Sequence, residues 1–245
     1  MALIEQEVSI TTKYGRMPGF AACPDEPGRF PGIIFYMDAP GYREELCNMA
    51  RRIAKQGYFC ILPDMYYRLG TVRFDLPRRS DKMSAVVMAA MRHITNADVV
   101  DDTAGILGFL DAQDKCAPGP VGCVGHCMSG QYITTVAAKF PTRFAASASM
   151  YGVGIVTKEE DTPHLLLDQV QGELYYAFAE TDAHVPDHVI PDLNAALETS
   201  GVDHEVQVFA GTEHGFQFAE RQVYAPVAAE EAWSKLFDMW ARRLK

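Results

Sequence analysis

The sequence predicts an α/β fold with a mainly parallel central sheet and helices on both faces. Strand-like apolar runs alternate with segments of helical spacing along most of the 245 residues, and such alternation is typical of parallel sheets. Residues 32–37 form a continuous apolar run of the kind that is buried on both faces of a sheet. Because single α/β domains commonly reach this length, we expect one domain over residues 1–245.

The first half of the chain predicts a hairpin, two further strands and three helices. Residues 5–23 alternate polar and apolar side chains around Tyr14-Gly15, which indicates two antiparallel strands joined by a turn. Apolar residues recur at helical spacing over residues 44–56, and Gly57 is placed to cap that helix. The remaining elements expected here are a strand at 58–62, a loop at 63–81, and helices at 82–95 and 97–113.

The second half repeats the same alternation after the strand that begins at Val121. We expect helices at 131–140, 186–199 and 225–244, and strands at 143–151, 172–179 and 204–209. No internal repeat, low-complexity tract or linker divides this pattern.

The stretch from Val121 to Gly130 predicts a strand, a tight turn and a helix start, with Cys127 at the turn. This arrangement is the nucleophile elbow of α/β-hydrolases, whose pattern is G-x-nucleophile-x-G. Gly125 matches the first glycine, whereas Ser129 stands at the second and Gly130 follows one place later. A cysteine in an apolar strand often simply packs, so the elbow alone does not decide between a nucleophile and a core residue.

The rest of a catalytic triad follows in the order that this fold requires, nucleophile, acid and then histidine. Asp182 comes directly after the predicted strand at 172–179, and His214 lies on a glycine-flanked loop after the strand at 204–209. Either residue taken alone is compatible with a surface turn or an ordinary loop histidine. Their joint occurrence in the right order predicts a Cys127, Asp182 and His214 triad.

At these positions the sequence resembles the dienelactone hydrolases, a cysteine-nucleophile branch of the α/β-hydrolases. The matching pieces, besides the elbow, are Met17-Pro18-Gly19-Phe20, Met37-Asp38-Ala39-Pro40-Gly41, Gly57-Tyr58, Leu62-Pro63-Asp64-Met65-Tyr66, Asp182 with Val185-Pro186, and His214-Gly215-Phe216. They span nearly the whole chain in consistent order. The resemblance implies hydrolysis of an ester or lactone bond of a small molecule through a thioester acyl-enzyme.

Two backbone groups are expected to stabilise the oxyanion. The fold places one donor at the N–H of the residue after the nucleophile, Met128. Matching the family motif residue by residue places the second at Ala39. The same match puts Asp38 where the family carries an acidic residue beside the resting cysteine.

Candidate substrate-binding residues come from two regions. The loop at 63–81 is rich in tyrosine and arginine, and loops of this kind frame pockets in this fold; its candidates are Tyr66, Tyr67, Arg68, Arg78 and Arg79, with Arg73 beside them. The other candidates are His126, Phe216 and Phe218. His126 is equally compatible with a residue that merely fits at the elbow. Phe218 stands where the family carries an arginine that binds a carboxylate, which predicts a preference for neutral substrates.

Composition excludes several classes of function. The net charge of −10, with no Lys/Arg run longer than two, argues against nucleic-acid or anionic-membrane partners. The apolar run at residues 83–91 is too short to span a bilayer. Six scattered cysteines without a secretory segment predict reduced thiols in a cytoplasmic enzyme.

We expect neither a metal nor another cofactor. His184 and His188 have the i, i+4 spacing of zinc ligands on a helix, but Pro186 lies between them and disrupts that helix. Two alternatives to a hydrolase stay open, namely a ligand-binding relative that has lost turnover and a redox-sensing thiol protein. The sequence predicts no oligomeric state and names no specific substrate.

Overall fold

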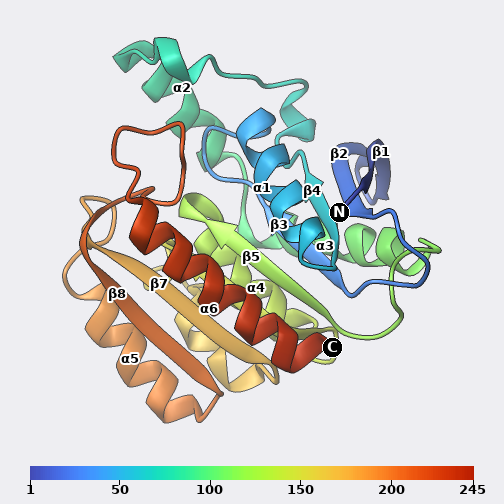
Figure 1. The fold of residues 1–245 in the computed structure, drawn as a ribbon. Helices are drawn as coiled ribbons and strands as arrows, with labels where there is room; N and C mark the ends of the chain where they lie inside the picture. The colour runs from blue at the N-terminus through green and yellow to red at the C-terminus, as the bar shows by residue number, and fades with distance from the viewer. The chain divides into compact units, whose positions relative to one another are not determined.

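The computed structural model describes residues 1–245, which divide into two compact units, Met1–Pro118 and Gly119–Lys245. The strands of the first unit follow the order β1-β2-β4-β3 (Figure 1). They are β1 (Leu3–Thr12), β2 (Gly15–Pro24), β3 (Gly32–Tyr36) and β4 (Phe59–Pro63). The hairpin β1-β2 is antiparallel, and β3 pairs with β4 in parallel. The predicted turn at Tyr14-Gly15 is confirmed, with Gly15 at a φ of 136° that favours glycine.

Three helices belong to this first unit: α1 (Glu44–Lys55), α2 (Asp81–Arg92) and α3 (Asn96–Asp111). The helix α1 packs on β2 and β4, and α3 packs on β1. A Cβ atom at Gly105 would lie 2.6 Å from the Thr11 carbonyl oxygen, so only glycine allows α3 to approach the hairpin this closely. The loop at 63–81 is confirmed, and it contains two short 3₁₀ turns, η1 (Tyr67–Leu69) and η2 (Leu76–Arg78).

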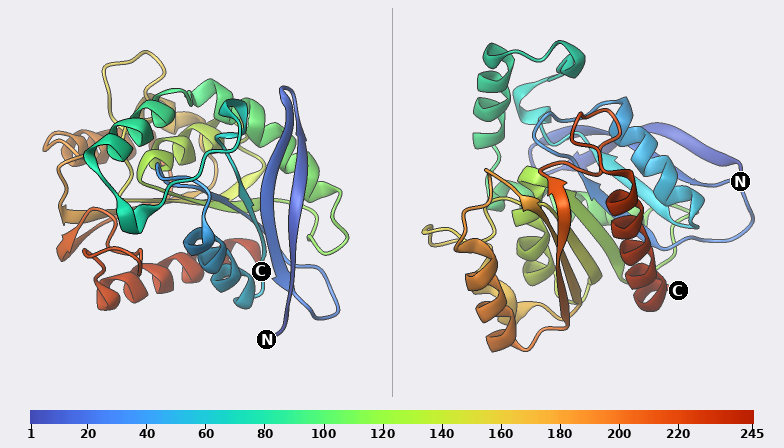
Figure 2. Two further views of the ribbon diagram at one scale, coloured as in Figure 1. Left: turned by 90° about the horizontal axis from the view of Figure 1, so that it is seen from above. Right: turned by 60° about the vertical axis from the view of Figure 1, so that its left-hand side comes forward.

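The second unit has four parallel strands in sequential order, β5 (Val121–His126), β6 (Phe144–Met150), β7 (Glu173–Thr181) and β8 (His204–Glu213). Its helices are α4 (Gly130–Lys139), α5 (Val189–Ser200) and α6 (Pro226–Leu244). The helix α6 covers one face of these strands, and α4 and α5 lie on the other (Figures 1 and 2). Because the four strands run in one direction, the loops at their carboxyl ends gather at one edge.

Three details of the second unit differ from the predictions. The helix α5 starts at Val189 rather than at 186, because residues 186–189 form a turn in which Val189 N–H bonds to the Pro186 carbonyl. The strand β8 continues to Glu213, past the predicted end at 209. A 3₁₀ helix, η4 (Pro163–Gln169), was not predicted, since its sequence lacks a sustained helical period. No helix of the chain has the length and apolar character needed to cross a membrane.

Candidate active site

Cys127 lies at the turn between β5 and α4, as the elbow pattern predicts. Its φ of 53° is in the left-handed region, where a residue other than glycine is strained. A single 3₁₀ turn, η3 (Cys127–Ser129), joins the strand to the helix. Cys127 is also the one cysteine of the six that is not buried. Its thiol is therefore accessible to a small molecule, whereas the five buried thiols are not.

The departure of Ser129 from the pattern has a structural explanation. Ser129 is fully buried, and its carbonyl oxygen would lie 2.6 Å from a Cβ atom at Gly125, so the first glycine of the pattern is required. The second position that has no room for a side chain is Gly130, one residue after the second glycine of the pattern. A Cβ atom at Gly130 would lie 2.1 Å from Cα of Gly152, at the start of the loop after β6.

Asp182 and His214 are joined by a hydrogen bond at the carboxyl ends of β7 and β8. Nδ1 of His214 lies 2.6 Å from Oδ2 of Asp182, and the two side chains are 12% and 4% exposed. The other carboxylate oxygen, Oδ1, accepts the His184 N–H at 2.9 Å. Both oxygens of Asp182 are therefore engaged, which fixes the carboxylate plane that the imidazole meets.

The electrostatic environment favours the charged form of His214. Burial alone lowers the pKa of His214, but the hydrogen bond that its ring donates to Asp182 and its interaction with Cys127 outweigh burial and raise this pKa from 6.5 to about 9. The second ring nitrogen, Nε2, is buried and makes no hydrogen bond of normal geometry to the protein. That nitrogen is thus available to exchange a proton with a group that reacts beside it.

Two rings hold the imidazole of His214 in place. Tyr151 packs edge-on against it at a centroid distance of 5.2 Å, and His184 packs in the same manner at 4.8 Å. Tyr151 is the only other non-glycine residue with positive φ, at 37°. Strained residues of this kind tend to occur at functional sites.

The peptide group that carries the Met128 N–H is held from its other side. The Val153 N–H donates to the Cys127 carbonyl oxygen at 3.0 Å. Because a trans peptide is planar, this bond fixes the direction of the Met128 N–H, which points away from Val153. A fixed donor of this type is what an oxyanion site needs.

In the first unit, the peptide that carries the Ala39 N–H is held in a comparable way. Gly41 N–H donates to the Asp38 carbonyl oxygen at 2.9 Å, within a turn where Gly41 has a φ of 80°. The hydroxyl of Tyr66 donates to the Ala39 carbonyl oxygen at 2.6 Å and is fully buried. Tyr66 was predicted to contact substrate, and in this structure its hydroxyl supports the loop at Ala39.

Asp38 makes an ion pair that the sequence did not suggest. Its buried carboxylate meets the Arg43 guanidinium through two contacts, Nη1 to Oδ1 at 2.5 Å and Nη2 to Oδ2 at 3.2 Å. A bidentate pair of this type orients both groups. Asp38, which the family resemblance places beside the resting cysteine, therefore has Arg43 as an ion-pair partner.

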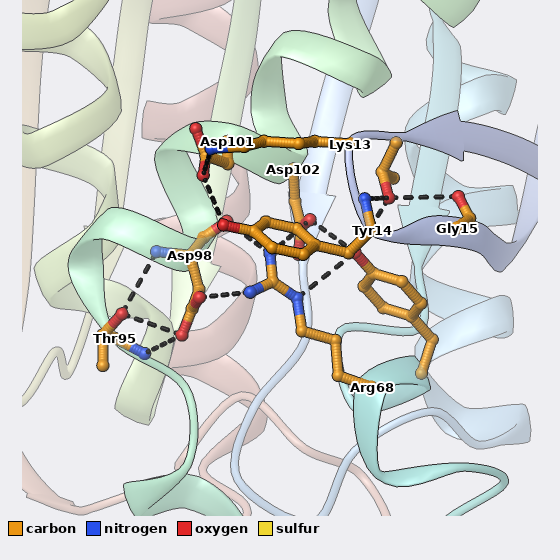
Figure 3. A network of polar contacts seen from close by, with 10 residues as sticks. Lys13, Tyr14, Gly15, Arg68, Thr95, Asp98, Asp101 and Asp102 are labelled. Atoms are coloured by element: carbon orange, nitrogen blue, oxygen red, sulfur yellow. Dashed lines mark hydrogen bonds and ion pairs between the residues drawn. The ribbon is translucent and has the colours of Figure 1, made fainter.

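Arg68 belongs to a polar network in the first unit (Figure 3), and Tyr67 joins this network through Asp102. The Arg68 guanidinium pairs with Asp98 and, at 2.8 Å, with Asp102, and it lies 3.9 Å from the centre of the Tyr14 ring. The Tyr67 hydroxyl donates to Asp102 at 2.7 Å. Both predicted substrate contacts thus have structural partners that tie the loop at 63–81 to α3.

The other arginines of this loop have polar partners as well. Arg78 is largely exposed and lies 3.3 Å from Asp75, whereas Arg79 donates to the Ser84 hydroxyl at 3.0 Å. Arg73 pairs with Asp64 at 2.7 Å. Their role in substrate binding stays a prediction.

His126, Phe216 and Phe218 are fully buried and pack around Tyr151. Nε2 of His126 lies 3.1 Å from the Gln217 side-chain oxygen. The structure also identifies a residue that sequence reasoning missed. Arg221 places its guanidinium carbon 4.5 Å from the centre of the Phe218 ring, next to the histidine loop. No feature of the sequence indicated that Arg221 would lie beside Phe218, because this contact depends on the turn at Gly215.

His184 and His188 have the spacing of zinc ligands in the sequence. No group of three or more His, Cys, Asp or Glu side chains in the chain has the arrangement to hold a metal ion. His184 instead packs on His214 through its ring.

Comparison with known proteins agrees with this geometry. The family model described as "Dienelactone hydrolase family" matches residues 17–244. The chain belongs to the dienelactone hydrolase family. This confirms the resemblance drawn from the motifs, and it confirms the predicted class, an ester or lactone hydrolase with a small-molecule substrate.

Relatives and solved structures of this family extend over nearly the whole chain. A Synechocystis protein provisionally named a carboxymethylenebutenolidase is 27% identical, covering 97% of this chain and 96% of its own length. One from Methylorubrum extorquens is 25% identical, covering 98% and 81%. The crystal structure of a provisionally assigned dienelactone hydrolase from Klebsiella pneumoniae superposes with a TM-score of 0.88 at 22% identity, covering 99% and 100%. These comparisons confirm the α/β-hydrolase fold class.

Proposed function

We propose that this dienelactone hydrolase family member cleaves an ester or lactone bond of a small molecule with Cys127 as its nucleophile and a thioester as its intermediate. The observation that carries the proposal is the convergence at one edge of three groups. These are a strained, partly exposed cysteine at an elbow, an imidazole that interacts with that cysteine, and a carboxylate hydrogen-bonded to the same imidazole.

In the first half-reaction, Cys127 loses its proton to His214 and attacks the substrate carbonyl carbon as a thiolate. Asp182 accepts a hydrogen bond from Nδ1–H and stabilises the imidazolium that forms. A raised pKa of His214, about 9, keeps the ring charged while the thiolate is present. The negative charge that develops on the carbonyl oxygen is met by the Met128 N–H, and Ala39 stays the predicted second donor.

Collapse of this intermediate breaks the bond to the leaving oxygen, which takes the proton from Nε2 of His214. The acyl group remains on the Cys127 sulfur as a thioester. Water then attacks the thioester carbonyl with His214 as general base, and the thiolate is released with a carboxylic acid product. In a lactone both products remain one molecule, a hydroxy acid.

A ligand-binding protein without turnover is the alternative from a different class. It requires no bond between His214 and Asp182, and it requires no strain at Cys127. The redox-sensor alternative has less support, because Cys123, four residues before Cys127, is fully buried and burial raises its thiol pKa to about 12. A buried thiol of this kind is a poor resolving partner.

Pre-steady-state kinetics with p-nitrophenyl acetate test the proposal. We expect a burst of p-nitrophenol of about one equivalent per enzyme, as an acyl-enzyme pathway requires. Cys127→Ala should abolish the burst, whereas Cys116→Ala, a matched change at a buried cysteine, should retain it. Turnover that survives in Cys127→Ala would contradict the proposal, and so would wild-type protein that shows no hydrolysis of activated esters.

A further inference from the structure

A cavity of about 210 Å³ adjoins the Cys127 and His214 side of the second unit. Its walls come from the loop after β6, the loop after β7 and Val189, the first residue of α5. Most of its surface is apolar. The side chains that matter here are Val153, Val156, His184, Val185, Pro186 and Val189.

Two of these wall residues contact the proposed triad directly. Val153 donates its backbone N–H to the Cys127 carbonyl oxygen at 3.0 Å. His184 packs its ring on the His214 ring at 4.8 Å. The cavity therefore shares two wall residues with the contacts that surround the proposed triad.

The wall formed by the loop after β6 is held in shape by buried contacts. The Thr162 hydroxyl, which is 2% exposed, accepts the Thr157 N–H at 2.8 Å and lies 2.9 Å from Nδ1 of His164. The His164 N–H in turn donates to the Ile155 carbonyl oxygen at 3.1 Å. The opposite wall is tied to the triad through the bond from His184 N–H to Asp182. A cavity with walls fixed in this way needs little reorganisation to accept a ligand.

We propose that this cavity binds an apolar group of the substrate, a phenyl ring or an alkyl chain of roughly six heavy atoms, beside the bond that is cleaved. This inference rests on the proposed function for the identity of its ligand. The expected size of this group follows from the volume of the cavity, since a dry apolar cavity of about 150 Å³ already holds benzene. Whole drug-sized ligands need about 300 Å³ or more, so only part of a substrate fits.

A larger hollow of about 520 Å³ lies between β8 and the start of α6, and it makes a poorer candidate. Its lining includes neither Val153 nor His184, the two residues that connect the smaller cavity to the triad. It also contains Gln207 and Glu231, which are hydrogen-bonded to each other at 2.6 Å.

The first test compares the kcat/KM of p-nitrophenyl hexanoate with that of p-nitrophenyl acetate. Each buried methylene should raise kcat/KM about fourfold, so the hexanoate should be preferred by at least roughly tenfold when the acyl chain is the group that occupies the cavity. Val156→Phe should fill the cavity and remove most of that preference. Val227→Phe makes the same change at an 82% exposed valine that does not line the cavity, and it should leave the preference intact. Val156→Leu serves as a milder filling variant if the phenylalanine does not fold.

The second test measures binding without turnover, so that it succeeds or fails independently of the proposed function. One pair of amides, N-(4-nitrophenyl)hexanamide and N-(4-nitrophenyl)acetamide, varies the acyl side. The other pair, N-hexylacetamide and N-ethylacetamide, varies the leaving side. We expect tighter calorimetric binding of the longer amide in one of the two pairs, lost in Val156→Phe. That pair identifies which side of the substrate occupies the cavity.

The outcomes separate the two claims. Length-independent binding in both pairs, or a length preference that Val156→Phe leaves unchanged, would overturn the cavity assignment even if Cys127 is the nucleophile. Tighter binding that depends on Val156, together with hydrolysis that persists in Cys127→Ala, would retain the cavity and reject the proposed mechanism.

Discussion

The backbone N–H of Val153 donates a hydrogen bond to the carbonyl oxygen of Cys127 at 3.0 Å. This bond connects the loop after β6 to the elbow, and it fixes the peptide that carries the Met128 N–H. Gly152, which precedes Val153, leaves no room for a Cβ atom at Gly130. The elbow and this loop therefore form one packed structure, in which the strained cysteine is held by its neighbours.

The first prediction concerns the close approach at Gly130. Gly130→Ala places a Cβ atom 2.1 Å from Gly152 Cα, so it should destabilise the fold by about 1–3 kcal/mol and lower esterase activity. Chemical denaturation measures the first effect. Gly108→Ala is the control, since nothing lies within 4 Å of its Cβ and alanine favours a helix. An unchanged denaturation midpoint in Gly130→Ala would show that the loop after β6 moves easily.

The second prediction concerns thiol reactivity. One equivalent of iodoacetamide should modify Cys127 and abolish activity, because the other five cysteines are buried. Peptide mass mapping of the labelled protein identifies the site. Cys127→Ala should take up no label under the same conditions. Complete inactivation with the label on Cys23 or Cys116 would overturn the assignment.

The third prediction concerns His214 and Asp182, which should fail as one unit. His214→Ala should lower kcat by at least roughly a thousandfold, because both proton transfers are lost. Adding Asp182→Asn to that variant should change kcat little. Steady-state kinetics of the two single variants and the double variant complete the cycle. If the reductions in kcat of the two single variants multiplied in the double variant, the 2.6 Å contact would have no part in catalysis.

The fourth prediction is a dependence of stability on pH. The folded-state pKa of His214 is raised from 6.5 to about 9, so the protonated ring stabilises the fold fully below pH 6.5. This contribution, on the order of 2–3 kcal/mol, should be lost as the pH rises through 9. Urea denaturation of wild type and His214→Asn at pH 6.5 and pH 9.5 measures it. Equal losses in the two proteins would show that another group is responsible.

The fifth prediction concerns substrate charge. Phe218 is fully buried at the position where the family resemblance implies a carboxylate-binding arginine, so neutral esters should be preferred. An unpaired carboxylate in a partly dry site costs several kcal/mol, roughly a thousandfold in kcat/KM. The comparison is a dienelactone carboxylate against its methyl ester. Preference for the free acid would contradict this hypothesis. If that preference disappeared in Arg221→Gln, Arg221 would be the residue that binds the substrate carboxylate.

Much of this structure could be predicted from the residues alone. The spacing of apolar residues predicts the alternation of strands and helices. The elbow, Asp182 and His214 could be proposed because each comes directly after a predicted strand. The resemblance to the family was equally visible, because its motifs are contiguous in sequence. These features depend on local pattern, which a single sequence contains.

Other features depend on packing between distant segments. Nothing in the sequence marked Asp38 as the partner of Arg43, or Arg68 as the partner of Asp98 and Asp102. The loop at 152–171 has no periodicity, so neither η4 nor the cavity wall at Val153 could be anticipated. The predicted substrate contacts Tyr66 and Arg68 look functional by residue type, and only the fold shows which structural partners they have. The cytoplasmic location stays a prediction.

In the proposed mechanism, Cys127 carries the acyl group as a thioester. Intact-protein mass spectrometry after rapid mixing with p-nitrophenyl acetate and acid quench detects this intermediate. We expect one added acetyl group on the wild-type protein, mapped to Cys127 and removed by neutral hydroxylamine, and none on Cys127→Ala. An acetyl group on a serine, histidine or other cysteine during turnover, or rapid turnover with no acylated protein and no burst, would contradict the claim.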